Sequence, residues 1–101
     1  MSIPEWRDTT SYQRGERGKT DPREWCISFA DLTIFVHRLV HRDGWFLRCV
    51  SLNIRSYPLG DSTADWAKER ALKRCRLVAV ARLADIDTII EHNPHRHGVG
   101  P

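Results

Sequence analysis

The most reactive side chains in this sequence are histidines and cysteines, and one of each flanks a single Asp-Gly turn. His37 precedes Asp43-Gly44 and Cys49 follows it. If the flanking strands pair around a three-residue loop, the imidazole and the thiol lie side by side. An imidazole in that position can lower the pKa of a thiol and activate it. Catalysis would also require an orienting group and an oxyanion hole, and no helix start or glycine-rich loop lies near the pair. We therefore expect an inert cross-strand pair and no enzymatic activity.

Three further histidines lie close together near the C-terminal end, at positions 92, 95 and 97. Histidine is a common ligand of zinc and nickel. Pro94 and Gly98 lie among these histidines and no cysteine is close, so they do not form the closed ligand set of a structural metal site. No glycine-rich phosphate loop follows a strand. We expect neither a metal site nor a cofactor.

The strongest candidate for a binding surface is a basic run between residues 66 and 82, which holds six Lys and Arg residues against one Glu. Trp66, Arg70, Lys73 and Leu77 recur at i, i+4, i+7 and i+11, so they share one stripe of a helix, and Arg74 adjoins them. Exposed Trp and Arg are typical of protein interfaces, and basic residues beside an aromatic also suit nucleic acid. Alternatively, the N-terminal arm or a second helix covers Trp66.

Two arginines add positive charge near the tip of the hairpin. In the register of a three-residue loop, Arg38 and Arg48 face each other directly, and opposed like charges cost energy. They therefore need an acid, supplied either by this chain, for example by Asp87 or Glu91, or by a partner. We include both arginines in the predicted partner-binding set.

Three strands and a helix are predicted to position these residues. Residues 24–29 alternate in the period of a strand, and a tight turn follows at Ala30-Asp31. Residues 32–40 and 45–57 are rich in β-branched and aromatic residues, as strands prefer. A three-residue loop between them pairs Val36 with Val50 and Ile34 with Leu52, which gives a consistent apolar face. We predict an α+β fold in which a three-stranded antiparallel meander packs against a long or broken C-terminal helix.

The helix is expected to follow the Pro-Leu-Gly segment, with Ser62 as its N-cap. Its sheet-facing stripe consists of small and apolar residues at helical spacing: Ala64, Ala67, Ala71, Cys75, Val78, Ala79, Ile86, Ile89 and Ile90. Acidic residues follow Ala84, and the helix dipole disfavours acids at a helix C-terminus. A break near Ala84 or Asp85 is therefore predicted, and Asp85 would then cap a second helix.

Size and composition place these elements in one domain. We assign residues 1–22 to a polar N-terminal arm, 23–92 to a single α+β domain and 93–101 to a polar, His-containing tail. The net charge of +3 does not by itself imply nucleic-acid binding. Three widely spaced cysteines favour a reducing, cytoplasmic location. The sequence has no apolar run of about 20 residues and no apolar segment of a secretory signal, so we expect no membrane association.

The layout resembles that of small phage and prophage accessory proteins. The resemblance covers about residues 24 to 82 and rests on the segments LTIFVHRLVHRDGWFLRCVSLNI and LGDSTADWAKERAL. Some small phage proteins inhibit a host system by covering a surface, so the resemblance implies an inhibitor of that kind. We expect a non-enzymatic protein that contacts a macromolecular partner, with a protein as the leading class. A nucleic-acid-binding module is the alternative. Homodimerisation through the outer sheet face or an edge strand is also open.

Overall fold

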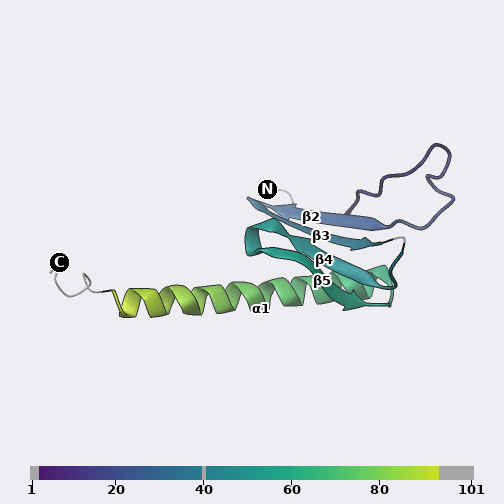
Figure 1. Cartoon of the computed structure of the whole chain (residues 1–101). Helices are drawn as coiled ribbons and strands as arrows, with labels where there is room; N and C mark the ends of the chain where they lie inside the picture. Colours follow the sequence, from purple (N-terminus) through teal and green to yellow (C-terminus); the bar gives the residue numbers. More distant parts are fainter. Residues whose placement is uncertain (1–2, 40, 94–101) are drawn as a thin grey trace.

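The structure, a computed structural model, describes residues 3–39 and 41–93. It consists of an antiparallel sheet packed on one helix (Figure 1). The sheet has five strands in the order β1-β2-β3-β4-β5. The elements are β1 (Arg7–Asp8), β2 (Glu24–Phe29), β3 (Leu32–Arg38), β4 (Trp45–Cys49), the 3₁₀ turn η1 (Val50–Leu52), β5 (Ile54–Gly60) and α1 (Ala64–Glu91). The α+β class is confirmed, but the three-stranded meander is wrong.

The two additional strands have separate origins. The predicted strand 45–57 is divided by η1, after which Asn53 adopts a left-handed conformation with φ of 56° and the chain reverses. Asparagine tolerates this region better than most residues with a side chain. The other additional strand, β1, lies within the predicted polar arm, where Arg7 pairs with Cys26 of β2. Val40, the last residue of the predicted second strand, lies outside the described residues.

The loop between β3 and β4 is longer than predicted. Arg38 pairs with Trp45, so residues 39–44 connect the two strands. The register therefore differs from the predicted one by an odd number of residues. For this reason Trp45, Leu47 and Cys49 face α1, in place of the expected Phe46 and Val50. Because apolar residues occupy both phases of β4, hydrophobic alternation did not determine its register. The tight turn after β2 is confirmed, since Phe29 pairs with Leu32.

The core lies between the sheet and the first half of α1. Val36, Leu47 and Cys49 have the largest fully buried side chains. The buried residues of α1 are Ala67, Ala71 and Cys75, whose small side chains let the helix approach the strands closely. The remainder of the predicted sheet-facing stripe is not buried, and Ile86, Ile89 and Ile90 are more than half exposed. The physical reason is that α1 is longer than the sheet.

Both ends of α1 differ from the prediction. The N-cap is Thr63 rather than Ser62, because the Thr63 hydroxyl accepts the Trp66 backbone N–H at 3.3 Å. The helix also continues through Asp85 without a break. Asp85 does not cap a second helix but pairs with Arg82, one turn earlier, at 3.8 Å.

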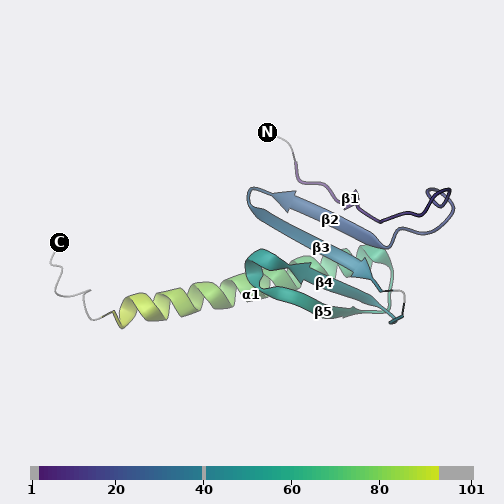
Figure 2. The same cartoon turned by 45° about the horizontal axis from the view of Figure 1, so that its top comes forward.

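The second half of α1 gives the molecule an elongated shape. It extends past the end of the sheet in both views (Figures 1 and 2). The radius of gyration is 18.4 Å, whereas about 13 Å is typical of a compact chain of 100 residues. Over the described ranges, no helix combines the length and the apolar character needed to cross a membrane.

Candidate partner-binding surface

The predicted basic stripe of α1 lies beside the edge strand β5. Lys73, Arg74 and Leu77 line a depression of about 290 Å³ together with Tyr57 and Pro58 of that strand. Trp66 and Arg70 continue the same face toward the start of the helix. We call this set the arginine–aromatic surface: Tyr57, Trp66, Arg70, Lys73, Arg74 and Leu77. The helix residues predicted for the stripe therefore lie together, on a side of α1 not buried against the sheet.

Arg70 is held in place by backbone and ring contacts. Its Nη1 donates a hydrogen bond to the Leu59 carbonyl oxygen at 2.7 Å, and its guanidinium carbon lies 5.0 Å from the centroid of the Trp66 ring. Gly60 permits this approach, because a Cβ at that position would lie 2.8 Å from Arg70 Nη1. Contacts within the chain thus hold the Arg70 guanidinium over the Trp66 indole, without a binding partner.

Arg74 forms a similar pair with β5. Its guanidinium carbon lies 4.3 Å from the centroid of the Tyr57 ring. Lys73, on the outer side, pairs with Glu69 at 3.3 Å, and both side chains are largely exposed. Such exposed pairs contribute little to stability. The surface therefore carries three cations against one adjacent acid.

The apolar residues of the surface are open to solvent. Trp66 is 55% exposed and Leu77 is 61% exposed. In the structure, the described part of the N-terminal arm does not cover Trp66, so that alternative is wrong. Within the described residues, the arm places Trp6 against the core cluster, where Lys68 Nζ lies 5.8 Å from the centroid of its ring. Trp66 and Leu77 are thus available to a partner.

Arg38 and Arg48 do not belong to this surface, and the prediction that they oppose each other is wrong. Arg38 lies opposite Trp45 and donates to the Asp61 carboxylate at 2.9 Å. Arg48 lies opposite Phe35, on the other face of the sheet, and its guanidinium carbon is 4.1 Å from the centroid of that ring. The longer loop moved the two arginines to opposite faces, and the acid that Arg38 needs comes from Asp61 instead of Asp87 or Glu91.

His37 and Cys49 are also apart, which corrects the expected neighbour pair. His37 lies opposite Phe46 on the outer face, and burial holds the pKa of its imidazole below the usual value despite Glu24. Cys49 is fully buried on the opposite, helix-facing side. Burial raises the pKa of the neighbouring Cys75 thiol to about 11, with Cys49 adding to the effect. A thiol with that pKa is protonated at neutral pH and is a poor nucleophile.

The outer face of the sheet is covered by arginine side chains. Arg42 lies over Phe46, with its guanidinium carbon 4.7 Å from the ring centroid, and Arg48 covers Phe35. Cys26 on the same face is only 3% exposed. The exposed edge strand β5 contains Pro58, which has no N–H to offer a pairing strand.

Sequence reasoning missed the contribution of β5. Tyr57 was placed at the end of a longer strand and Pro58 just beyond it, and their position beside α1 depends on the reversal at Asn53. The useful signal was the shortness of the connection between Gly60 and the start of the helix, which keeps β5 close to α1.

We also looked for metal-binding clusters and for similar proteins. Among residues 3–39 and 41–93, no group of three or more His, Cys, Asp or Glu side chains is placed to hold a metal ion. His95 and His97 lie outside the described residues. No protein-family model, curated protein or solved structure matches the chain.

Proposed function

We propose that this protein is a non-enzymatic binding protein that uses the arginine–aromatic surface to contact an acidic region of a partner protein. The proposal rests on one arrangement of side chains. The guanidinium of Arg70 lies over the Trp66 ring, and the guanidinium of Arg74 lies over the Tyr57 ring. Trp66 and Leu77, at the two ends of this row, are both exposed. Trp, Tyr and Arg are the residues most enriched among those that dominate protein binding energies. Binding of this kind would act by covering a surface of the partner.

The charge of the surface favours an acidic partner. Arg70, Lys73 and Arg74 lie within two turns of α1, and two of them are already positioned by intramolecular contacts. A pre-positioned cation loses less conformational freedom when it binds a carboxylate. Complementary charge also accelerates association and selects among partners.

A protein fits the aromatic residues better than a nucleic acid does. Non-specific nucleic-acid binding uses free aromatic faces as platforms for stacked bases. Here Arg70 occupies one face of Trp66, and Arg74 occupies one face of Tyr57. Glu69 further reduces the positive charge beside Lys73. A nucleic-acid-binding module remains the second candidate because three cations share this helix face.

A peptide-display selection against the full chain tests the proposal. We expect enrichment of peptides that combine Asp or Glu with an aromatic or aliphatic anchor. Trp66→Ala and Arg74→Ala should each weaken binding of a selected peptide about tenfold or more. Arg14→Ala is the matched charge control, because Arg14 is exposed and lies in the N-terminal segment, outside the surface; it should leave the affinity unchanged. Circular dichroism checks that each variant is folded.

Two results would reject the protein-binding proposal. The first is peptide binding that Trp66→Ala and Arg74→Ala leave unaffected. The second is binding of a DNA or RNA oligonucleotide that falls steeply with salt and requires Lys73 and Arg74, with no peptide enriched. The second result would establish the nucleic-acid alternative.

A further inference from the structure

From Leu72 to Ile90, α1 carries an uncovered row of apolar residues that the arginine–aromatic surface does not include. We call this row the apolar stripe: Leu72, Ala79, Leu83, Ile86 and Ile90. With the intervening Arg76, its positions follow the alternating spacing of four and three residues that defines the seam of a coiled coil. The stripe and the arginine–aromatic surface lie about a third of a turn apart on the helix.

This part of the helix receives little support from the rest of the chain. From residue 76 to residue 91, all of which the structure describes, no side chain is buried and Val78 alone is half-buried. The segment contains several β-branched residues, which are not strong helix formers. Isolated helices of this length are marginal in water. A second helix packed on the apolar stripe would supply the missing stabilisation.

Charge along α1 identifies the occupant. Basic residues extend as far as Arg82, whereas Asp85, Asp87 and Glu91 follow it and no basic residue occupies the last turn. Acids at a helix C-terminus oppose the helix dipole. A parallel copy would bring the acidic ends together, whereas an antiparallel copy would bring each acidic end beside a basic segment. From this complementarity we propose that the protein forms an antiparallel homodimer through the apolar stripe.

One register satisfies the apolar residues and the charges together. It places Leu72 against Ile90 of the second copy, and Ala79 against Leu83 of the second copy. On the side away from the sheet, the same register sets Lys73 beside Asp87 of the second copy, and the two Val80 side chains meet near the twofold axis. The two Arg82 side chains also approach each other, and each is already paired with its own Asp85 at 3.8 Å.

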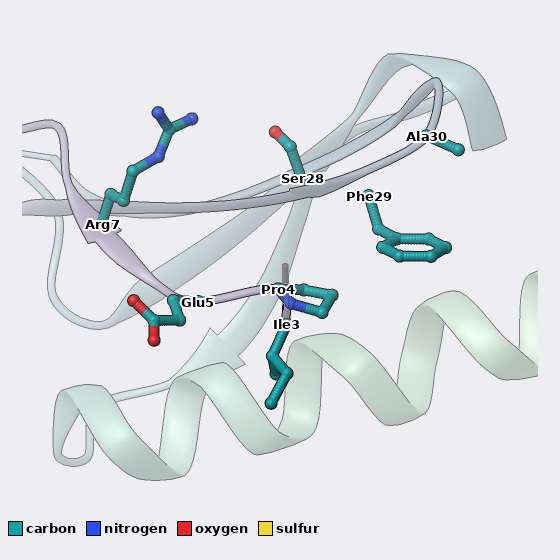
Figure 3. A pocket seen from close by; sticks show the side chains of 7 residues that line it. All are labelled: Ile3, Pro4, Glu5, Arg7, Ser28, Phe29 and Ala30. Atoms are coloured by element: carbon teal, nitrogen blue, oxygen red, sulfur yellow. The ribbon is translucent and has the colours of Figure 1, made fainter. Parts of the chain in front are cut away.

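The sheet provides a receiving site for the end of the second helix. A groove of about 300 Å³ beside Leu72 is lined mainly by apolar residues of the N-terminal segment and the β2–β3 hairpin: Pro4, Ile27, Phe29, Leu32 and Ile34. Phe29 is 56% exposed, and Figure 3 shows its ring on the side of the hairpin that faces α1, with Pro4 and Ile3 nearby. In the proposed register, Ile89 and Ile90 of the second copy reach this groove.

Measurement of the solution mass tests the dimer. We expect sedimentation equilibrium of the full chain to report about twice the monomer mass of 11.7 kDa. Ile90→Ser should raise the dimer dissociation constant about thirtyfold or more, because it removes the apolar contact with Leu72 and the groove of the second copy. Leu77→Ser is the matched control, since Leu77 is also exposed but lies outside the apolar stripe; it should leave the mass unchanged. Neither residue is buried in the monomer, so both variants should remain folded.

A charge exchange tests the register and direction. Lys73→Glu and Asp87→Lys should each weaken the dimer about threefold to tenfold, since the twofold axis repeats the pair, and the double variant should restore it. A monomer at all concentrations, or a dimer that Ile90→Ser does not weaken, would overturn the proposal. Failure of the double variant to restore the dimer would overturn the antiparallel register. Because Trp66→Ala should leave the mass unchanged, these outcomes are independent of the proposed partner binding.

Discussion

At the residue scale, Gly44, just before β4, lies close to the backbone of Gly60 at the end of β5. Gly44 has φ of 93°, and a Cβ at that position would lie 3.1 Å from the carbonyl carbon and oxygen of Gly60. The left-handed conformation alone costs a residue with a side chain about 1–2 kcal/mol. The contact is with backbone, which cannot move away as the end of a long side chain can.

We predict that Gly44→Ala lowers the free energy of unfolding by about 2–3 kcal/mol, because strain and steric contact add together. Gly15→Ala is the control: Gly15 has φ of 83°, but a Cβ there would meet nothing within 4 Å. Its loss should be about 1–2 kcal/mol, the cost of the left-handed conformation alone. Urea denaturation measures both variants, and equal losses would show that the Gly44–Gly60 contact relaxes freely.

His37 should make the fold sensitive to mild acid. Burial lowers the pKa of its imidazole below the usual 6.5, so the folded protein favours the neutral form. The unfolded chain then binds a proton more readily as the pH falls. The stability that this residue contributes should be present above pH 6.5 and lost as the pH falls through the folded-state pKa.

The urea midpoint should therefore fall more between pH 7.5 and pH 5.5 in the wild type than in His37→Gln. Glutamine keeps a polar side chain but does not titrate in this range. An identical fall in both proteins would assign the acid sensitivity to other groups.

At the element scale, the start of α1 provides a direct comparison of two adjacent hydroxyls. The Thr63 hydroxyl accepts the Trp66 N–H, whereas Ser62 uses its backbone carbonyl to accept the Trp45 indole N–H at 2.9 Å. Thr63→Ala should reduce the free energy of unfolding by about 1 kcal/mol. Ser62→Ala should have little effect, because the carbonyl remains. Thermal or chemical denaturation separates the two, and a larger loss for Ser62→Ala would contradict this N-cap.

Local patterns predicted the parts of the fold that depend on neighbouring residues. The strand over residues 24–29, the tight turn after it and the stripe from Trp66 to Leu77 follow from periodicity within a few residues. The register of β4 was wrong because Phe46 and Leu47 are both apolar, so each face had an apolar candidate. The place of Tyr57 in the surface was missed because it depends on tertiary packing of β5 against α1.

The length of α1 was only partly predictable for a related reason. An apolar residue at helical spacing can face the protein's own core or a surface outside it, and the sequence pattern is the same. Ile86 and Ile90 were assigned to the sheet, but the sheet ends before them. Their burial against a second copy would account for the apolar pattern beyond the sheet.

At the scale of the whole molecule, α1 presents three faces. One packs on the sheet through Ala67, Ala71 and Cys75, one carries the arginine–aromatic surface, and one carries the apolar stripe. The sheet fixes the first half of the helix and leaves the second half projecting (Figure 2). Dimerisation and partner binding would therefore use adjoining faces of one element, with Lys73 at the border between them.

Hydrogen exchange should distinguish the two halves of the molecule. The amides of residues 80–91 should become more protected as the protein concentration rises, because the second copy stabilises the projecting helix. The amides of β3 and β4 should change much less. Protection of residues 80–91 that is independent of concentration would show that the helix is stable without a second copy.

The most direct test of the central claim, that the arginine–aromatic surface binds the partner, is a nuclear magnetic resonance titration of the full chain with a selected acidic peptide. We predict that the largest amide shifts fall between Trp66 and Leu77 and at Tyr57, and that they weaken in Arg74→Ala. Shifts that instead cluster on the outer sheet face around Phe35 and Arg48, with α1 unchanged, would contradict it.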